Sequence, residues 1–384
     1  MSEEGERMEI DDLLSEILLR LPPEPSSLPR ASLVSKRWRG LSRDPAFLRR
    51  FRARHRSHAP LLGGFFTDYP TPAHRNNFVS FVPTLDAPNR VRFPFPVADF
   101  PCILFSCRHG LVLAASEHRQ GFLVWDPVTG DQHRLEELPG LDAMNGAVLR
   151  TGEDHFQVVL VGHDEHHTQA LACVYSSQTR QWGGVISAPV PPVVSIVTEI
   201  PGVLVGDSIY WLSSRNPDHP TPILEFNLGT QSLAAIQLPV NMYGQGNHSL
   251  WVMRAQDGGL GFLFLWGTDA QLWKRTKTDG DGAANSWTIT KTIQMDKLLS
   301  LNTEEEKRSL SIEGLVEDRN VVFFRTAIGH FMVHLESLWS LRCKELSETH
   351  IIHVFHPFSS VYTAADNSTT SGSSERSINR SVDA

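Results

Sequence analysis

The chain opens with an apolar pattern of helical period. Apolar residues recur every three to four positions from Leu13 to Leu21, directly after two aspartates, and a proline-rich segment follows at residues 22–25. Acids suit the first turn of a helix, and proline ends a helix because it lacks a backbone donor. The pattern therefore predicts an amphipathic helix with a wide apolar face. Residues 1–10, which precede it, are expected to be flexible.

Two further helices are expected before residue 56. Residues 27–39 carry apolar side chains at helical spacing. A third helix is expected to begin at Asp44-Pro45, because aspartate caps helix starts and proline is favoured at the first helical position. The first part of the chain is thus predicted to consist of three short helices.

After Pro60 the pattern changes to alternating or short continuous apolar runs separated by turn residues. Such runs predict strands. Ten segments qualify, at residues 111–115, 122–126, 157–162, 170–176, 203–212, 223–228, 261–266, 286–293, 321–326 and 330–335. A short helix is expected within residues 295–307. The second part of the chain is therefore predicted to be all-β.

Related sequences recur in this β region. Trp125, Tyr175 and Phe226 precede similar turn sequences at spacings of 50 and 51 residues, and Trp273 follows 47 residues later. A period of about 50 residues with several strands in each unit is typical of kelch-like propeller blades. At roughly 50 residues per blade, residues 60–363 would form about six blades. A β-sandwich is the competing all-β architecture.

Charge also divides the chain into two parts. The whole chain has 35 Lys and Arg against 43 Asp and Glu, a net charge of -8, whereas residues 30–56 hold ten basic residues and one acid. This contrast indicates two modules, over residues 11–56 and 60–363. Residues 364–384 are rich in Ser, Thr and Asn, and they are predicted to be disordered because they have little apolar surface to bury.

Composition narrows the class of protein. With 20% charged and 41% hydrophobic residues, the chain is typical of a soluble folded protein. It has neither an apolar run of the roughly 20 residues that span a bilayer nor the basic start of a signal peptide. A cytoplasmic or nuclear location without a membrane partner is therefore expected. The cysteines at 102, 107, 173 and 343 have neither disulfide-framework nor zinc-site spacing, and they are expected to be reduced strand residues.

Two motifs contain residue types that are used in binding chemistry. His163-Asp-Glu-His-His167 has metal-ligating side chains, but no second cluster completes a tetrahedral set, and a surface loop is expected. Asp257-Gly-Gly-Leu-Gly261 lacks the strand-then-helix context of a phosphate-binding loop, and it predicts a hairpin turn. HExxH, GxSxG and P-loop motifs do not occur. No catalytic, metal or cofactor residue is therefore assigned.

Four blocks near the start of the chain resemble the F-box. Members of that family typically read Leu-Pro-x-x-Leu-Leu-x-Glu-Ile-Leu-x-Arg-Leu-Pro, then Ser-Leu, Val-Cys-Lys-x-Trp-Arg-x-Leu and Asp-Pro-x-Phe. The corresponding blocks are Asp11-Asp-Leu-Leu-Ser-Glu-Ile-Leu-Leu-Arg-Leu-Pro22, Ser27-Leu28, Val34-Ser-Lys-Arg-Trp-Arg-Gly-Leu41 and Asp44-Pro-Ala-Phe47. The leading Leu-Pro of the family is replaced by Glu9-Ile10, and its cysteine by Ser35.

The β region resembles the propeller-like associated domain of a large group of plant F-box proteins, especially those of grasses. The resemblance rests on Cys107-Arg-His-Gly-Leu111, Trp125-Asp-Pro-Val-Thr-Gly130 and Val174-Tyr-Ser-Ser177 with Trp182. It implies an α+β protein in two modules, an F-box and then a kelch-like propeller, that acts as the substrate-recognition subunit of an SCF-type ubiquitin ligase. The F-box would bind a Skp-family adaptor and, through it, a cullin, while the β domain would hold an unidentified target without catalysis.

The size of the helical module agrees with a docking role. Residues 11–56 hold too few residues to bury a large core, and they have no disulfide or metal ligands, so part of the apolar face is expected to be covered by a partner or by the rest of the chain. The resemblance implies the adaptor-binding residues, which are Leu13, Leu14, Ile17, Leu18, Leu21, Pro22, Leu28, Val34, Lys36, Trp38, Leu41 and Phe47.

Two other functions remain open at this stage. The first is a propeller enzyme or carbohydrate-binding protein, in which the helical segment merely packs on the β domain. The second is a nucleic-acid-binding adaptor that uses the basic run to contact phosphates. The aromatic residues within that run, Trp38, Phe47 and Phe51, fall at positions on the helix face that suit packing better than base stacking, so nucleic-acid binding is not favoured.

Overall fold

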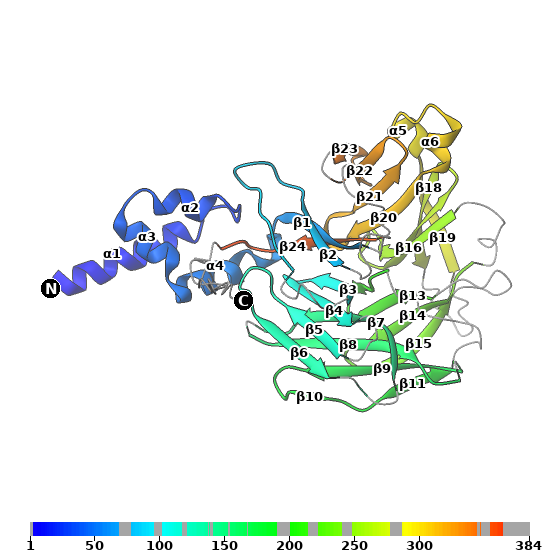
Figure 1. Ribbon diagram of the computed structural model, residues 1–384, viewed down its shortest axis with the longest axis horizontal. Helices are drawn as coiled ribbons and strands as arrows, with labels where there is room; N and C mark the ends of the chain where they lie inside the picture. Colours follow the sequence, from blue (N-terminus) through cyan, green and yellow to red (C-terminus); the bar gives the residue numbers. More distant parts are fainter. Residues whose placement is uncertain are drawn as a thin grey trace, which may run out of the picture.

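The computed structural model shows a helical module at one end of the molecule and an all-β domain at the other (Figure 1). It describes residues 3–68, 78–95, 102–116, 121–136, 138, 141–152, 154–166, 168–189, 200–213, 222–239, 248–276, 286–343, 346 and 354–363, with the backbone alone for residues 3–10. The predicted disordered tail, 364–384, lies outside the described residues. In the part of the chain that is described, no helix is long and apolar enough to cross a membrane.

The first helix is longer than the sequence analysis predicted. Helix α1 spans Glu3–Leu18, so the backbone of most of residues 1–10 is helical. The added segment is rich in glutamate, which is a good helix former and is favoured near a helix N-terminus. The flexibility expected for residues 1–10 stays a prediction.

The module has four α-helices in place of the three expected. The remaining elements are α2 (Ser27–Ser32), α3 (Lys36–Arg43), α4 (Pro45–His55) and the short 3-10 helix η1 (Arg56–His58). The single helix predicted over 27–39 is divided because Ser35 has an extended backbone, and its hydroxyl accepts a hydrogen bond from the Trp38 N–H at 3.2 Å. Asp44 caps α4 in the same way, as predicted, and accepts from the Phe47 N–H at 2.8 Å.

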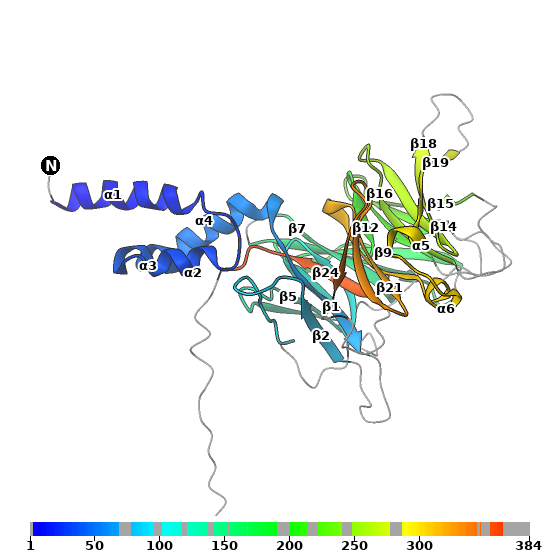
Figure 2. The ribbon, with the colours of Figure 1, turned by 90° about the horizontal axis from the view of Figure 1, so that it is seen from above.

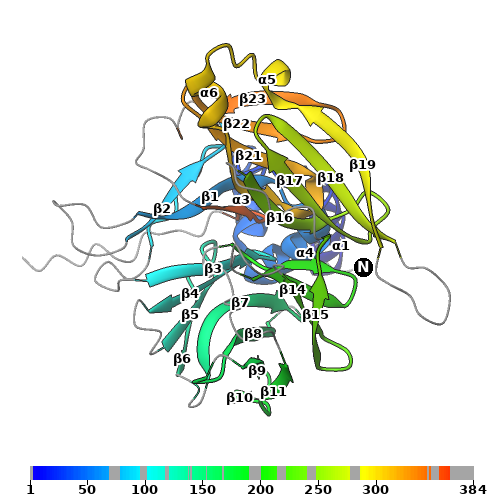
Figure 3. The same ribbon diagram turned by 90° about the vertical axis from the view of Figure 1, so that its right-hand side faces the viewer.

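The β domain is a propeller of six sheets (Figure 3). The first blade contains β3 (Cys102–Arg108), β4 (Leu111–Ser116), β5 (Gly121–Trp125) and β6 (Gln132–Glu136). The second contains β7 (Asp142–Arg150), β8 (Phe156–His163), β9 (Gln169–Ser176), β10 (Gln181–Trp182) and β11 (Ile186–Pro189). The third contains β12 (Val203–Val205), β13 (Ser208–Leu212), β14 (Pro222–Asn227) and β15 (Ser232–Gln237). The six-blade arrangement confirms the propeller and excludes the β-sandwich.

The remaining blades complete the ring. The fourth blade contains β16 (His248–Arg254), β17 (Leu260–Trp266), β18 (Asp269–Thr276) and β19 (Ser286–Gln294). The fifth contains β20 (Ser311–Val316), β21 (Val321–Thr326), β22 (Gly329–His334) and β23 (Trp339–Cys343). The closing blade contains β1 (Leu61–Asp68), β2 (Phe78–Pro83) and β24 (Phe355–Ser359). Strands β1 and β24 pair antiparallel, so the two ends of the domain meet in one sheet.

The aromatic repeat marks the same place in successive blades. Trp125, Tyr175, Phe226 and Trp273 lie on β5, β9, β14 and β18, each the third strand of its blade in chain order. The spacing near 50 residues is therefore the spacing of blades. Differences from the predicted elements are local: the strand expected over residues 203–212 is divided into β12 and β13 by a turn in which Gly206 has a φ of 59°.

One other predicted segment also divides, and another is confirmed. The helix expected within residues 295–307 is two short helices, α5 (Met295–Leu298) and α6 (Glu304–Arg308), and the second is capped by the Thr303 side chain. The predicted hairpin turn at 257–261 is confirmed between β16 and β17.

The surface loop expected at 163–167 is wrong for His163, which is buried at the end of β8, while Asp164 forms the following turn by accepting from two backbone N–H groups.

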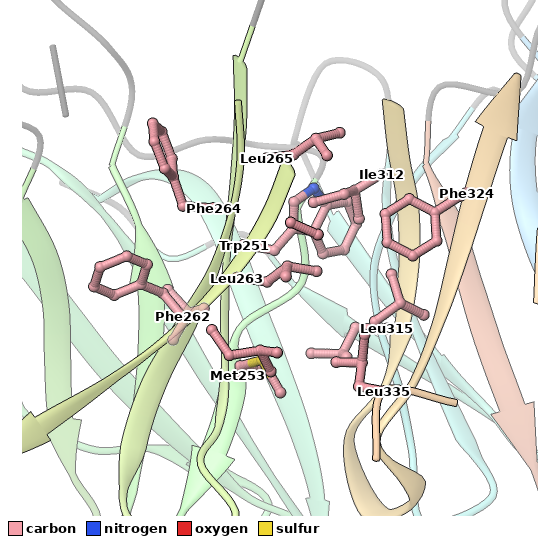
Figure 4. Close-up of a cluster of buried hydrophobic side chains, with 14 of the residues drawn as sticks. Trp251, Met253, Phe262, Leu263, Phe264, Leu265, Ile312, Leu315, Phe324 and Leu335 are labelled. Carbon is pink, nitrogen blue, oxygen red and sulfur yellow. The ribbon is translucent and has the colours of Figure 1, made fainter. Parts of the chain in front are cut away.

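The core of the propeller lies between neighbouring blades. Figure 4 shows the largest of these clusters, which joins side chains from the third, fourth and fifth blades. Phe262 on β17 and Phe324 on β21 are fully buried there. Burying one such side chain contributes roughly 1.5–3 kcal/mol, so the blades are held together mainly by the apolar faces they turn to one another.

Candidate docking surface and module junction

Helix α1 has two apolar stripes, which explains its wide apolar face. Leu14 and Leu18 are buried in the core of the helical module. Leu13 and Ile17, one helical turn apart, are 64% and 48% exposed. Side chains four residues apart lie on the same helix face, so these two form an apolar stripe that nothing in the described chain covers.

The other predicted adaptor-binding residues divide in the same way. Leu28 and Phe47 belong to the buried core of the helical module, and Leu21, Trp38 and Leu41 pack against it. They stabilise the helices that carry the surface. The exposed members are Leu13, Ile17, Pro22, Val34 and Lys36.

The connection between α2 and α3 exposes a second apolar pair. Leu33 and Val34 are 78% and 64% exposed, immediately before Ser35, which caps α3. Leu33 is not among the predicted adaptor-binding residues because it lies outside the four sequence blocks that resemble the F-box. An apolar pair next to a helix-capping serine is the one local signal that could have drawn attention to it. The exposed stripe on α1 and this pair are together called the docking surface.

An ion pair fixes α1 against α3 beside this surface. The Arg37 Nε lies 2.5 Å from the Asp11 Oδ1, and both side chains are partly exposed. At the other side of α1, Arg50 on α4 lies 2.6 Å from the Glu16 carboxylate and is well exposed. Exposed pairs of this kind contribute only about 0–1 kcal/mol each, so they orient the helices more than they stabilise them.

The core of the helical module is completed by the end of the propeller. Val361, which follows β24, packs in the same cluster as Leu18 and Phe51 and is 4% exposed. Two residues later, the Thr363 hydroxyl accepts a hydrogen bond of 3.0 Å from the Arg52 guanidinium on α4. The expectation that the rest of the chain covers part of this small module is therefore confirmed.

A loop from the closing blade makes a second link. Residues 84–95 leave β2, and the Asn89 side chain accepts from the Ser26 N–H at 3.0 Å and donates to Glu24 at 3.4 Å. Figure 2 shows the helices held against one end of the propeller. The helical module and the propeller are thus joined by packing and hydrogen bonds as well as by the chain itself.

Part of the basic run faces the propeller across this junction. Arg49, Arg52 and Arg56 lie at helical spacing and, with carboxylates that include Asp126 and Asp131, line a cavity of about 800 Å³. Burial lowers the pKa of the Arg52 guanidinium, and the two aspartates oppose that effect. At these three positions the basic run forms one wall of this cavity.

An ion pair between Arg108 and Glu317 joins the first and fifth blades. Arg108, in the first blade, makes two hydrogen bonds to the Glu317 carboxylate, which follows the first strand of the fifth blade. Arg108 also donates to the Gly202 carbonyl at 2.7 Å, beside the third blade. The hydrogen bonds of Arg108 thus tie the first, third and fifth blades together. Next to Arg108, burial lowers the pKa of His109 to about 4.

Burial makes the cysteine thiols of the chain less acidic than usual. All four cysteines are free thiols, and burial raises the pKa of Cys102 to about 12 and that of Cys343 to about 11. Thiols of such high pKa are poor nucleophiles near neutral pH. Among the residues that the structure describes, no group of three His, Cys, Asp or Glu side chains could hold a metal ion.

Comparison with known families agrees with both modules. A model described as "F-box protein AT5G49610-like, beta-propeller" matches residues 104–365, and an F-box domain model matches residues 11–50. The chain belongs to this family of F-box proteins. A putative F-box/kelch-repeat protein of Arabidopsis thaliana, At3g17280, is 23% identical over 324 residues, which cover 77% of this chain and 80% of that protein. The F-box is thus the helical module, and the family's propeller is the β domain.

Solved structures show only a loose likeness to this F-box protein. The WD40 domain of SCAP from fission yeast has a TM-score of 0.36 and 10% identity, and it covers 69% of this chain and 57% of its own. AztD from Citrobacter koseri has a TM-score of 0.39 and 10% identity, and the match covers 78% of this chain and 89% of AztD. At this level of similarity, no functional information is transferred.

Proposed function

We propose that this F-box protein is the substrate-recognition subunit of an SCF-type ubiquitin ligase. The observation that supports it best is the exposed stripe of Leu13 and Ile17, on a helix whose other apolar stripe already fills the module core. An uncovered apolar stripe on an F-box fits a Skp-family adaptor, and the adaptor would connect the chain to a cullin. The propeller would hold the target protein. Such a subunit would act in the cytoplasm, the nucleus or both.

The proposed mechanism is positional. Holding a target beside a ubiquitin-loaded enzyme converts an encounter in solution into a reaction within one complex, which raises the effective concentration of the reacting groups. The subunit itself then needs no reacting side chain. It needs a fixed distance between docking surface and target, and the packing of Val361 into the helical core supports a fixed arrangement.

Binding of a purified Skp-family adaptor to the full chain tests the proposal. The double variant Leu13→Ser/Ile17→Ser removes the exposed stripe. Buried anchors of an interface typically contribute 2 kcal/mol or more each, so the loss of both should weaken binding by about 4 kcal/mol, which is roughly 700-fold in affinity. The control variant Arg50→Gln removes an exposed ion pair and should change affinity by less than about fivefold. Circular dichroism should show intact folding in both variants.

Leu14 is unsuitable for this test. It is 8% exposed and packs in the module core, so its truncation would act on folding instead of docking. The proposal fails if the wild-type chain does not bind a Skp-family adaptor. The assignment of the surface fails if the Leu13/Ile17 variant binds as well as the wild type.

A further inference from the structure

Two buried polar side chains in the wall of the cavity beside α4 have hydrogen-bonding atoms without a partner. His356 on β24 is 3% exposed, and its Nδ1 makes no hydrogen bond within the described part of the chain. The Arg108 side chain is 7% exposed, and its Nη1 likewise has no described acceptor. Both residues line the cavity. Because buried polar groups are nearly always hydrogen-bonded, these two side chains indicate a polar partner inside the cavity.

The unused atoms of Arg108 and His356 are suited to oxygen acceptors. Arg108 donates from Nε and Nη2 to the Glu317 carboxylate, and from Nη2 to the Gly202 carbonyl. A guanidinium has five N–H groups in a rigid plane, so the two on Nη1 remain for another acceptor. Burial lowers the pKa of His356 to about 4, so its imidazole is neutral near pH 7 and one ring nitrogen carries a proton to donate.

The F-box supplies positive charge to the same cavity. Arg49 and Arg52, three residues apart on α4, both line it, and neither forms an ion pair with a described carboxylate. The Arg52 guanidinium is partly desolvated, because burial lowers its pKa. A desolvated cation gains more than an exposed one from a bound anionic oxygen, since less water competes for the contact.

Carboxylates also line the cavity, but each is either paired or exposed. Glu317 is paired with Arg108, and Asp126 is paired with Arg150 at 2.9 Å. The other carboxylates of the lining are all exposed, at Asp131, Asp154, Asp318 and Glu336. Water and salt screen exposed charges more than buried ones. The buried part of the wall therefore favours an anion.

Apolar side chains complete the lining. Five of them are at most 9% exposed, namely Val128, Leu315, Val316, Val321 and Val361. Pockets for small molecules typically have volumes of about 300–1,000 Å³ and combine apolar walls with a few placed polar groups. The cavity, of about 800 Å³, has this size and this mixture. An organic molecule would fill it better than an inorganic ion.

We propose that this cavity binds a small organic anion, a phosphate ester or a carboxylate, whose charged group contacts Arg52 and whose oxygen atoms reach Arg108 and His356. The ligand would touch the F-box through α4 and the propeller through β3 and β24, so its binding would also hold the two modules together. This inference is independent of the ubiquitin-ligase proposal, because it involves neither an adaptor nor a target protein.

Isothermal titration calorimetry on the full chain tests the proposal with four defined probes. These are phenyl phosphate, benzoate, inorganic phosphate and the uncharged benzyl alcohol. One of the two organic anions should bind at a single site, and at least about tenfold more tightly than inorganic phosphate, because its ring buries apolar surface. The tighter of the two identifies the charged group that the cavity prefers. Benzyl alcohol should not bind.

Two pairs of arginines on one helix give a matched comparison. Arg49→Gln/Arg52→Gln removes two positive charges from the lining and should weaken the anion at least about tenfold. Arg50→Gln/Arg54→Gln removes the same charge from positions outside the lining and should change the affinity less than about twofold. Circular dichroism and the melting temperature should show that both variants fold.

Two single variants cover the case in which loss of the bond from Arg52 to Thr363 unfolds the F-box. Arg49→Gln removes a side chain that makes no described hydrogen bond, and it should weaken binding at least about threefold. His356→Leu acts from the propeller side and replaces an unpaired buried imidazole by an apolar group, so the fold should be retained while affinity falls at least about fivefold.

Hydrogen exchange shows whether the ligand bridges the modules. Amides of α4 should exchange more slowly when the bound anion is added, and unchanged exchange would overturn the bridging arrangement. The inference is overturned if neither organic anion binds, if the two arginine pairs weaken binding equally, or if His356→Leu binds as well as the wild type. Binding that occurs only in a chain truncated after Thr363 would assign the cavity to the chain's own residues 364–384 and would also overturn it.

Discussion

Two truncations that differ by three residues should separate the C-terminal tail from the module junction. A chain that ends at Thr363 keeps Val361 in the helical core and keeps the hydrogen bond from Arg52 to the Thr363 hydroxyl. A chain that ends at Ser360 loses both. The first truncation should leave the stability of the F-box unchanged, whereas the second should destabilise it.

The magnitude follows from what the three residues bury. Val361 is 4% exposed, and burying a valine side chain contributes about 1.5–3 kcal/mol. A hydrogen bond to a charged group such as the Arg52 guanidinium contributes about 1.5–3 kcal/mol. Because neighbouring contributions are not strictly additive, a loss of about 3–5 kcal/mol is expected for the Ser360 truncation. Whole domains are stable by only about 5–15 kcal/mol, so the small F-box would lose a large share of its stability.

Hydrogen exchange is the appropriate measurement because it reports the opening of the helices separately from that of the propeller. Amides of α4 should exchange at least about 100-fold faster in the Ser360 truncation than in the Thr363 truncation, while the β17 amides should be unaffected. The point variant Val361→Ala should give an intermediate acceleration. Equal exchange of α4 in the two truncations would refute the conclusion that the end of the propeller completes the F-box core.

Three further predictions concern the propeller. Arg108→Met should destabilise the propeller by about 3–5 kcal/mol in urea unfolding because the partly buried Glu317 carboxylate loses its partner. Glu317→Leu in the same chain should restore most of the loss, and a change below about 1 kcal/mol in the single variant would contradict this. Burial lowers the pKa of His356 to about 4 from an ordinary 6.5, so the unfolded chain binds this proton more readily. The free energy of unfolding should be highest above pH 6.5 and should fall as the pH drops toward 4. The variant His356→Gln should make the urea midpoint less dependent on pH in this range. Because Cys102 is buried and burial raises the pKa of its thiol to about 12, this thiol should resist iodoacetamide at pH 8 until the chain unfolds, and rapid labelling of Cys102 in a native sample would disprove its burial.

The architecture was predictable because its signals are local and repeated. The aromatic residue on the third strand of the first four blades recurs with the blade period, and the proline and capping residues between the helices mark real ends. Outer strands such as β6 and β15 were not predicted, since most of their side chains are exposed and polar or small and give no apolar alternation. Helical periodicity identified α1 but could not show that Leu14 is buried and Leu13 exposed, because both apolar stripes lie on one wide face.

Contacts between distant parts of the chain had no local signal. Val361 packs on helices that lie more than 300 residues earlier, and no pattern around Val361 reveals that contact. The exposure of Leu33 and the ion pair between Arg108 and Glu317 likewise depend on how separate elements pack. Their detection required the three-dimensional arrangement.

The pairing of the first and last strands of the propeller has a consequence for synthesis. Helices α1 to α4 are made before the propeller, but Val361, which completes their core, and β24, which completes the closing blade, are made after the other five blades. At about 5–20 residues per second, roughly 15–60 seconds separate the helices from Val361. A product that stops early therefore lacks a finished F-box as well as a closed propeller. Under the proposed function, such fragments would compete poorly for the adaptor, and the order of translation would limit the release of receptors that could dock without holding a target.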